Sequence, residues 1–179
     1  MKKIVLPLAA LAAMMPALAG AADFTLSSKA LTDGVAAEQV ANAFGCSGGN
    51  VSPDLAWSGA PEGTKAFTLT LYDPDAPTGS GFWHWVVTDI PGDATGLPAG
   101  AGEDLSAVAA RAMRNDAGTR TYLGPCPPEG ASPHRYVFTL TALGVDHLEV
   151  PDDASAAIVG FMTGANALGR AELTVTYGR

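Results

Sequence analysis

The chain has 179 residues and a formal net charge of −8 at pH 7, from 10 Lys and Arg against 18 Asp and Glu. So acidic a chain is not expected to bind nucleic acid, because contact with the phosphate backbone requires a cationic surface. The same charge disfavours peripheral binding to an anionic membrane. Any bound anion would therefore have to be held by a local site that acts against the overall field.

Residues 1–21 are expected to be a secretory signal peptide. Two lysines form the positive start, an apolar stretch runs to Leu18, and the small residues at 17–21 resemble a cleavage site. The alternative is a retained anchor, but the stretch is shorter than a membrane span and contains two prolines. Residues 22–179 are then expected to form one exported domain, either periplasmic or secreted.

Short strands separated by turns dominate the predicted secondary structure, as 21 Gly and 13 Pro indicate. An exception is residues 36–44, where a short helix is predicted. The first clear strand is 66–73, in which Phe67, Leu69 and Leu71 share one face. Further strands are predicted at residues 85–90, 135–143 and 172–177.

A longer helix is predicted over residues 154–168, with Asp152 or Asp153 as its N-cap and Gly169 just past its end. Apolar residues with helical spacing should form its buried face: Ile158, Phe161, Met162, Ala165 and Leu168. The fold class is therefore mostly β, with a C-terminal helix and a single domain.

The chain has two cysteines, Cys46 and Cys126. An even count in an exported chain favours a disulfide, whereas two unrelated buried thiols or two reactive thiols are the alternatives. A bridge closing a loop of about 80 residues would stabilise the fold by roughly 4.5 kcal/mol in the chain-entropy model.

Three titratable side chains stand at the ends of predicted strands. Asp73 ends strand 66–73 on its apolar face, and His84 begins the following strand, in phase with Val86 and Ile90. His134 precedes strand 135–143 and is in phase with its apolar residues. If the first two strands form a hairpin, Asp73 and His84 lie at the same end of the sheet. Inward-facing groups of this kind must satisfy one another by hydrogen bonds.

Such a group suits the binding of an anion. Two imidazoles oriented by Asp73 and Asp75 would present two N–H donors to a phosphate or carboxylate. Within residues 125–128 only Cys126 has a backbone N–H, which would be a third donor held between prolines. The alternatives are an ordinary turn at residues 73–77 and half-buried histidines without a ligand.

Several motifs resemble the phosphatidylethanolamine-binding protein family, also called Raf kinase inhibitor-like proteins, and within it the bacterial exported branch. The matching segments keep their order and span most of residues 22–179. They are Tyr72-Asp73-Pro74-Asp75-Ala76-Pro77, Trp83-His84-Trp85, residues 122–130, residues 134–138 and the N-terminal signature at residues 44–53.

The resemblance implies two antiparallel sheets with Greek-key connections and a C-terminal helix. It also implies an anion pocket and a cis peptide at Ala76–Pro77. Residues carried over to this pocket by matching position are Asp73, Asp75, His84, Cys126, Pro127, His134 and Tyr136. Cys126 stands where eukaryotic members have glycine, and the loop at residues 78–81 is short. Kinase inhibition is therefore not carried over.

The leading hypothesis is a non-enzymatic exported protein that binds a small anion, either free or on a partner protein, and that acts as a regulator or inhibitor. No cofactor and no metal are expected. One alternative is a hydrolase in which Asp and His activate Ser80 or Ser132, or hold a metal. A binding module with a vestigial pocket and a working surface elsewhere is another.

Overall fold

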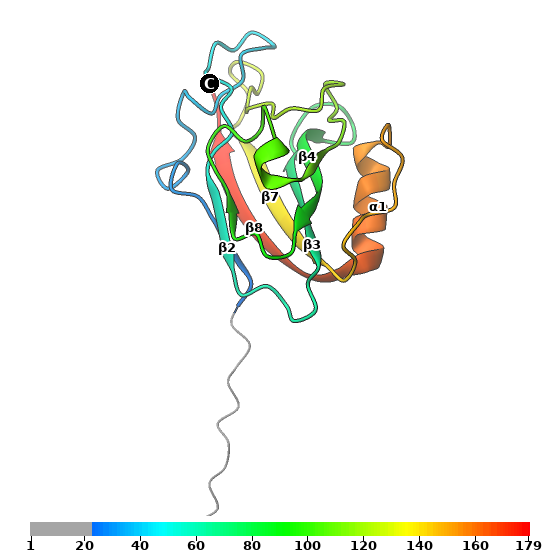
Figure 1. Cartoon of the computed structure of the whole chain (residues 1–179). Coiled ribbons are helices and arrows are strands. Elements are labelled where there is room, and N and C mark those ends of the chain that lie inside the picture. Colours follow the sequence, from blue (N-terminus) through cyan, green and yellow to red (C-terminus); the bar gives the residue numbers. More distant parts are fainter. Residues whose placement is uncertain (1–22) are drawn as a thin grey trace, which may run out of the picture.

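A computed structural model describes residues 23–179, and the predicted signal peptide lies outside them. Five antiparallel strands form the larger sheet, in the spatial order β6-β4-β3-β7-β8. Figure 1 shows β4, β3, β7 and β8 of this sheet. Its strands are β3 Ala66–Asp73, β4 Phe82–Pro91, β6 Arg111–Ala112, β7 His134–Leu143 and β8 Ala167–Tyr177. Three consecutive strands of this sheet, β3, β4 and β6, are followed by β7, which returns to pair with β3. This is the Greek-key order.

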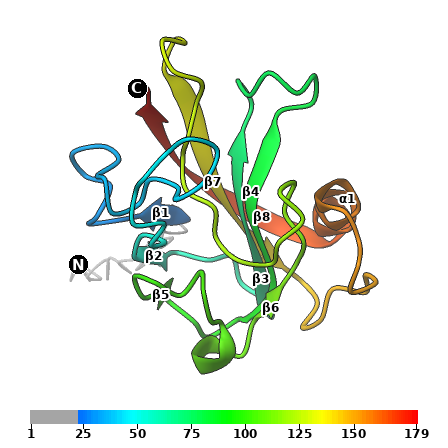
Figure 2. The same ribbon diagram turned by 90° about the horizontal axis from the view of Figure 1, so that it is seen from above.

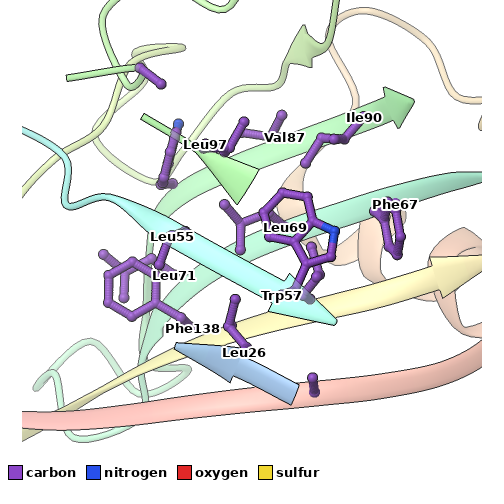
Figure 3. Packing of buried hydrophobic residues seen from close by; sticks show 14 of the residues in the cluster. Leu26, Leu55, Trp57, Phe67, Leu69, Leu71, Val87, Ile90, Leu97 and Phe138 are labelled. Atoms are coloured by element: carbon purple, nitrogen blue, oxygen red, sulfur yellow. The ribbon is translucent and has the colours of Figure 1, made fainter. Parts of the chain in front are cut away.

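A smaller antiparallel sheet packs on one face of the larger one. It contains β1 Thr25–Ser27, β2 Leu55–Ser58 and β5 Gly96–Leu97, and a short 3₁₀ turn, η1 Ser106–Val108, follows. The apolar core lies between the sheets, where Leu55 and Trp57 face Leu69 and Leu71 (Figure 3). The alternation predicted for strand 66–73 is thus confirmed.

The helix α1, Ala156–Asn166, lies on the opposite face of the larger sheet (Figure 2). The molecule therefore has three layers: small sheet, large sheet and helix. The predicted fold class is confirmed, and the predicted strands 85–90, 135–143 and 172–177 lie within β4, β7 and β8. No helix within residues 23–179 is long and apolar enough to cross a membrane.

The prediction of a short helix is wrong, and the prediction of the longer helix is wrong at both ends. Residues 36–44 form turns instead of a helix. The N-cap of α1 is Ser155, whose hydroxyl accepts the Ile158 N–H at 3.4 Å, and not an aspartate. The helix then passes directly into β8, so it ends before Leu168.

The predicted buried face of α1 is also wrong, except for Met162, which packs partly buried against the core. The helix buries Ala156, Val159 and Thr163, whereas Ile158 and Phe161 are 49% and 73% exposed. The underlying sheet face accounts for this, because it carries threonines there and Thr163 bonds to the Thr68 hydroxyl at 3.4 Å. Small residues let the helix approach this polar face, and Ile158 and Phe161 point outward.

Two β-bulges in β4 change which side chains face the core. Tyr72 pairs with Trp83, and the preceding residue Leu71 pairs with Trp85. His84, between the two tryptophans, is therefore an extra residue in the ladder. A bulge places two successive residues of one strand opposite a single partner, on the same side. Trp85 accordingly belongs to the main core, whereas Val86 packs on the helix side. The expected phase of His84 with Val86 is wrong for this reason, whereas the second bulge returns Ile90 to the core side, as expected.

The turn after β3 is closed by local hydrogen bonds. The Asp75 N–H donates to Asp73 Oδ1 at 2.8 Å, and the Thr78 N–H donates to the Ala76 carbonyl at 2.8 Å. Every peptide bond within residues 23–179 is trans, so the expected cis Ala76–Pro77 bond is wrong. The trans form of such a bond is favoured by about 0.5–1 kcal/mol in the absence of other constraints.

Candidate functional site: a histidine pocket at the end of the large sheet

A pocket of about 170 Å³ opens at the edge of the large sheet where β3 ends and β4 and β7 begin. Antiparallel pairing brings the last residue of β3, the start of β4 and the start of β7 to this one edge. The loop at residues 123–128 forms the facing wall. Six of the seven residues predicted for the site line this pocket: Asp73, His84, Cys126, Pro127, His134 and Tyr136.

Asp73 and His134 form a buried pair in the pocket. His134 Nδ1 lies 2.7 Å from Asp73 Oδ2, and the two residues are only 6% and 3% exposed. An ionised carboxylate accepts hydrogen bonds only, so Nδ1 carries the hydrogen and donates it. The ring of His134 is thereby fixed, and its remaining nitrogen, Nε2, is left for a ligand.

His84 is held by backbone and not by an aspartate. Its Nδ1 donates to the Leu123 carbonyl at 3.0 Å, because a carbonyl oxygen can only accept. Burial lowers the pKa of this imidazole, although the Leu123 carbonyl and the Asp73 carboxylate act in the opposite direction. The neutral ring therefore carries its hydrogen on Nδ1, and its Nε2 is an acceptor.

Tyr136 lies between the two imidazoles. Its ring meets His84 edge-on, with centroids 5.3 Å apart, and stacks with His134 at 6.5 Å. Its buried hydroxyl has no hydrogen-bond partner within the described residues. Burial raises the pKa of Tyr136, the Asp73 charge raises it further, and the Cys126 N–H lowers it. These two groups affect the hydroxyl without bonding it in good geometry, so it remains available to a ligand.

The wall at residues 123–128 is fixed from several sides. The Gly124 N–H donates to Asn50 Oδ1 at 2.9 Å, and the Pro125 carbonyl accepts the Ala41 N–H at 3.1 Å. A Cβ at Gly124 would collide with the Gln39 backbone carbonyl, so only glycine fits there. The Cys126–Cys46 disulfide is present as predicted, with the Cα atoms 6.0 Å apart.

Asp75 does not line the pocket and orients neither imidazole. Its carboxylate accepts three hydrogen bonds from Arg135, one from the backbone N–H at 2.9 Å and two from the guanidinium at 2.9 and 2.7 Å. The Arg135 side chain and backbone N–H hold the pKa of Asp75 well below its usual range. Asp75 therefore fixes the start of β7, next to His134, from outside the pocket.

An apolar rim surrounds the polar groups, and most of it has no direct signal in the sequence. Phe44 is 67% exposed at the mouth and has a left-handed backbone (φ 54°), whereas Phe82 contacts His84 with ring centroids 4.9 Å apart. Pro77, Leu123 and Pro128 complete the rim. The sequence can place Phe82 on the face of β4 that carries His84, because the two residues are two apart. Phe44 reaches the pocket because its segment is joined to Cys126 by the Cys46–Cys126 disulfide.

The arrangement required for the alternative hydrolase is not observed. Ser80 does not line the pocket, and Ser132 lies outside it in the depression that contains Asp75. Across residues 23–179, neither hydroxyl is hydrogen-bonded to an imidazole or a carboxylate, as activation would require. The same residues contain no cluster of three or more His, Cys, Asp or Glu that could hold a metal.

A pH dependence of stability follows from the burial of His84. A base whose pKa is depressed by folding binds protons more readily in the unfolded chain, so stability falls as pH drops below the unfolded value of about 6.5. Between pH 7 and 5, urea unfolding should show a larger loss of stability for the wild type than for His84→Asn. His147→Asn removes a half-exposed ring that lies 2.9 Å from Asp89, and it serves as the comparison for loss of a surface histidine. Equal losses in wild type and His84→Asn would contradict the assignment of a buried neutral ring.

Comparison with known proteins gives a consistent match. The model of a family described as phosphatidylethanolamine-binding protein matches residues 27–178. The UPF0098 protein YbcL of Escherichia coli is 46% identical over 164 residues, covering 89% of this chain and 90% of the relative. The putative lipoprotein LppC of Mycobacterium tuberculosis is 34% identical over 154 residues, 86% of this chain and 71% of the relative.

The solved structures include one with the same fold. The crystal structure of E. coli YbcL, described as a new member of the mammalian PEBP family, matches with a TM-score of 0.83 and 44% identity. The match covers 88% of this chain and 99% of that one. The overall fold is thus shared with a protein of known structure.

Proposed function

This chain belongs to the phosphatidylethanolamine-binding protein family, and on that premise we propose that it is a non-enzymatic binding protein for a small phosphate- or carboxylate-bearing group. The group would enter the pocket between His84 and His134. The observation that carries the proposal is the pair of engaged Nδ1 atoms, one on Asp73 and one on the Leu123 carbonyl.

Engagement of both Nδ1 atoms determines how an anion can bind. With neutral rings, each Nε2 is an acceptor and repels an anion's oxygen atoms. Protonation adds a hydrogen to each Nε2, and the resulting Nε2–H is a charge-assisted donor. We therefore propose that anion binding takes up protons, with Asp73 stabilising the imidazolium of His134. The Tyr136 hydroxyl and the Cys126 N–H supply further donors that need no protonation.

The apolar rim supports a ligand in which the anionic group carries an apolar or small organic substituent. Phe44 and Phe82 would lie against this substituent, while the anion occupies the polar end. A metabolite, a lipid headgroup or a partner protein could each supply such a group, and a regulatory or inhibitory role follows in the last case. Kinase inhibition is not part of this proposal.

Calorimetric titration with inorganic phosphate, phosphorylethanolamine and acetate tests the proposal directly. Binding should release or absorb heat and shift the ring resonances of His84 and His134. Absence of heat together with unchanged imidazole resonances would refute it. Turnover of an ester or phosphoester panel by the wild type, lost in His134→Ala, would instead support the hydrolase.

The proton-uptake mechanism predicts a pH-dependent affinity. Inorganic sulfate is the appropriate probe, because it remains a dianion from pH 8 to 5.5 whereas phosphate changes its charge. Sulfate affinity should rise as pH falls, by up to about tenfold per pH unit for each proton taken up. A constant affinity over this range would show that neutral N–H groups bind the anion.

Two observations support export of the protein. The Cys46–Cys126 disulfide is typical of oxidising compartments, and the LppC relatives are described as putative lipoproteins. We propose a periplasmic or secreted location with residues 22–179 as the functional domain. Mass spectrometry of the protein from the periplasmic fraction would test both the location and the cleavage near residue 21.

A further inference from the structure

A second cavity lies on the other face of the large sheet, away from the histidine pocket. It is a groove of about 360 Å³ between the sheet and α1. Figure 2 shows the helix beside the sheet, on the side opposite the small sheet that covers the core. The groove and the pocket use opposite faces of the same strands, since Tyr72 lines the former and Asp73 the latter.

The floor of this groove is a regular array of four threonines. Thr68 pairs with Thr141 across β3 and β7, and Thr70 pairs with Thr139 one step further along. Cross-strand partners lie about 5 Å apart, and residues two apart on one strand lie about 7 Å apart. Each hydroxyl both donates and accepts a hydrogen bond. Thr68 and Thr141 are only 1% and 3% exposed, so Thr70 and Thr139 are the part of the array that a ligand with several hydroxyl groups can reach most directly.

The existing bonds of these hydroxyls are weak and few. Thr68 is bonded to Thr163 at 3.4 Å and Thr139 to Glu172 at 3.5 Å, both at the long limit of a hydrogen bond. Thr70 and Thr141 have no such side-chain partner within residues 23–179. A ligand can therefore bond to the hydroxyls of Thr70 and Thr139 without displacing strong internal contacts.

The walls add groups that suit a polar ring. Tyr72 and Trp83 line one end, with their ring centroids 4.4 Å apart, and offer aromatic surface to C–H groups. Arg170 and Glu172 of β8 lie on the same side of that strand, and their opposite charges leave this wall neutral overall. A Cβ added at Gly160 of α1 would meet no atom within 4 Å, so the helix leaves space here.

We propose that this groove binds an uncharged polyhydroxylated ring, such as a sugar. Thr70, Thr139 and the Arg170–Glu172 wall would bond its hydroxyls, and the Tyr72–Trp83 pair would contact its apolar face. A small anion is a poorer occupant, because Glu172 offsets the charge of Arg170. The inference is independent of the histidine pocket and of its anion.

Nuclear magnetic resonance titration of the purified protein with glucose, N-acetylglucosamine and myo-inositol, each to about 50 mM, tests this proposal. At least one probe should give saturable shifts at the Thr70 and Thr139 amides and at the Trp83 indole. No saturable shift with any of the three, or shifts confined to His84 and His134, would overturn it. Binding of free glycine through Arg170 and Glu172, without binding of any of the three probes, would overturn it as well.

Two variants make the test specific. Thr70→Val with Thr139→Val keeps the shape of the floor and removes two hydroxyls, and should weaken binding about tenfold. Gly160→Leu should fill the groove and abolish binding, while the better helix propensity of leucine preserves the fold. Thr176→Val, an exposed strand position outside the groove, should leave binding unchanged. Binding that survives in both groove variants would overturn the proposal, and sulfate binding should be unaltered in all three.

Discussion

Loss of the Cys46–Cys126 disulfide is expected to lower the free energy of unfolding by up to about 4.5 kcal/mol. The two cysteines are 80 residues apart in sequence, so the bridge restricts a long loop of the unfolded chain. It also joins the segment that carries Phe44 to the wall that carries Cys126, and both line the histidine pocket. Its removal should therefore reduce sulfate affinity in addition to stability.

Urea unfolding of Cys46→Ser with Cys126→Ser, compared with the wild type, measures the loss. Added reductant should lower the unfolding midpoint of the wild type and leave the double variant unchanged, which controls for effects unrelated to the bridge. An unaltered midpoint in the double variant would contradict the argument from loop closure. Unaltered sulfate affinity would show that other contacts, such as Arg179 Nε to the Pro127 carbonyl at 2.7 Å, suffice to hold the wall.

Much of the site is predictable because strand alternation is a local property. Asp73 and His134 lie on the apolar faces of their own strands, and antiparallel pairing brings both to one edge. The period of two therefore places this pair correctly. Their 2.7 Å contact follows from the regular pairing of β3 with β7, because no bulge interrupts the alternation of side chains along this pair.

Alternation also places His84, because it follows Trp83, which pairs with Tyr72 on the helix side. The bulge in β4 acts on the next residue, so that Trp85 faces the same side as His84. No pattern in the sequence marks this bulge, because it arises from pairing with a strand that precedes it. The partner of His84, the Leu123 carbonyl, is equally unpredictable, since backbone groups carry no residue-type signal.

The contacts of Asp75 and of the buried face of α1 are decided by tertiary partners and could not be predicted from local spacing. Proximity in sequence groups Asp75 with Asp73, but residues two apart in a turn need not share a direction, and Arg135 offers a stronger partner than an imidazole. In α1, helical spacing correctly indicates a helix and the wrong buried face. The threonine-lined sheet beneath it selects small and polar contacts over Ile158 and Phe161.

His134→Asn should separate the role of the Asp73–His134 pair in folding from its role in binding. The asparagine amide can replace Nδ1–H as donor to Asp73, but it has no group at the position of Nε2. Sulfate affinity at pH 6 should fall by about ten- to hundredfold, as loss of one charge-assisted hydrogen bond implies. His134→Ala should have the same effect on affinity, and it should also destabilise the fold by about 3 kcal/mol, because it leaves the Asp73 carboxylate buried without its partner. Calorimetry and urea unfolding of the two variants measure both effects. Retention of wild-type affinity in His134→Asn would show that this imidazole positions Asp73 and does not itself contact the anion.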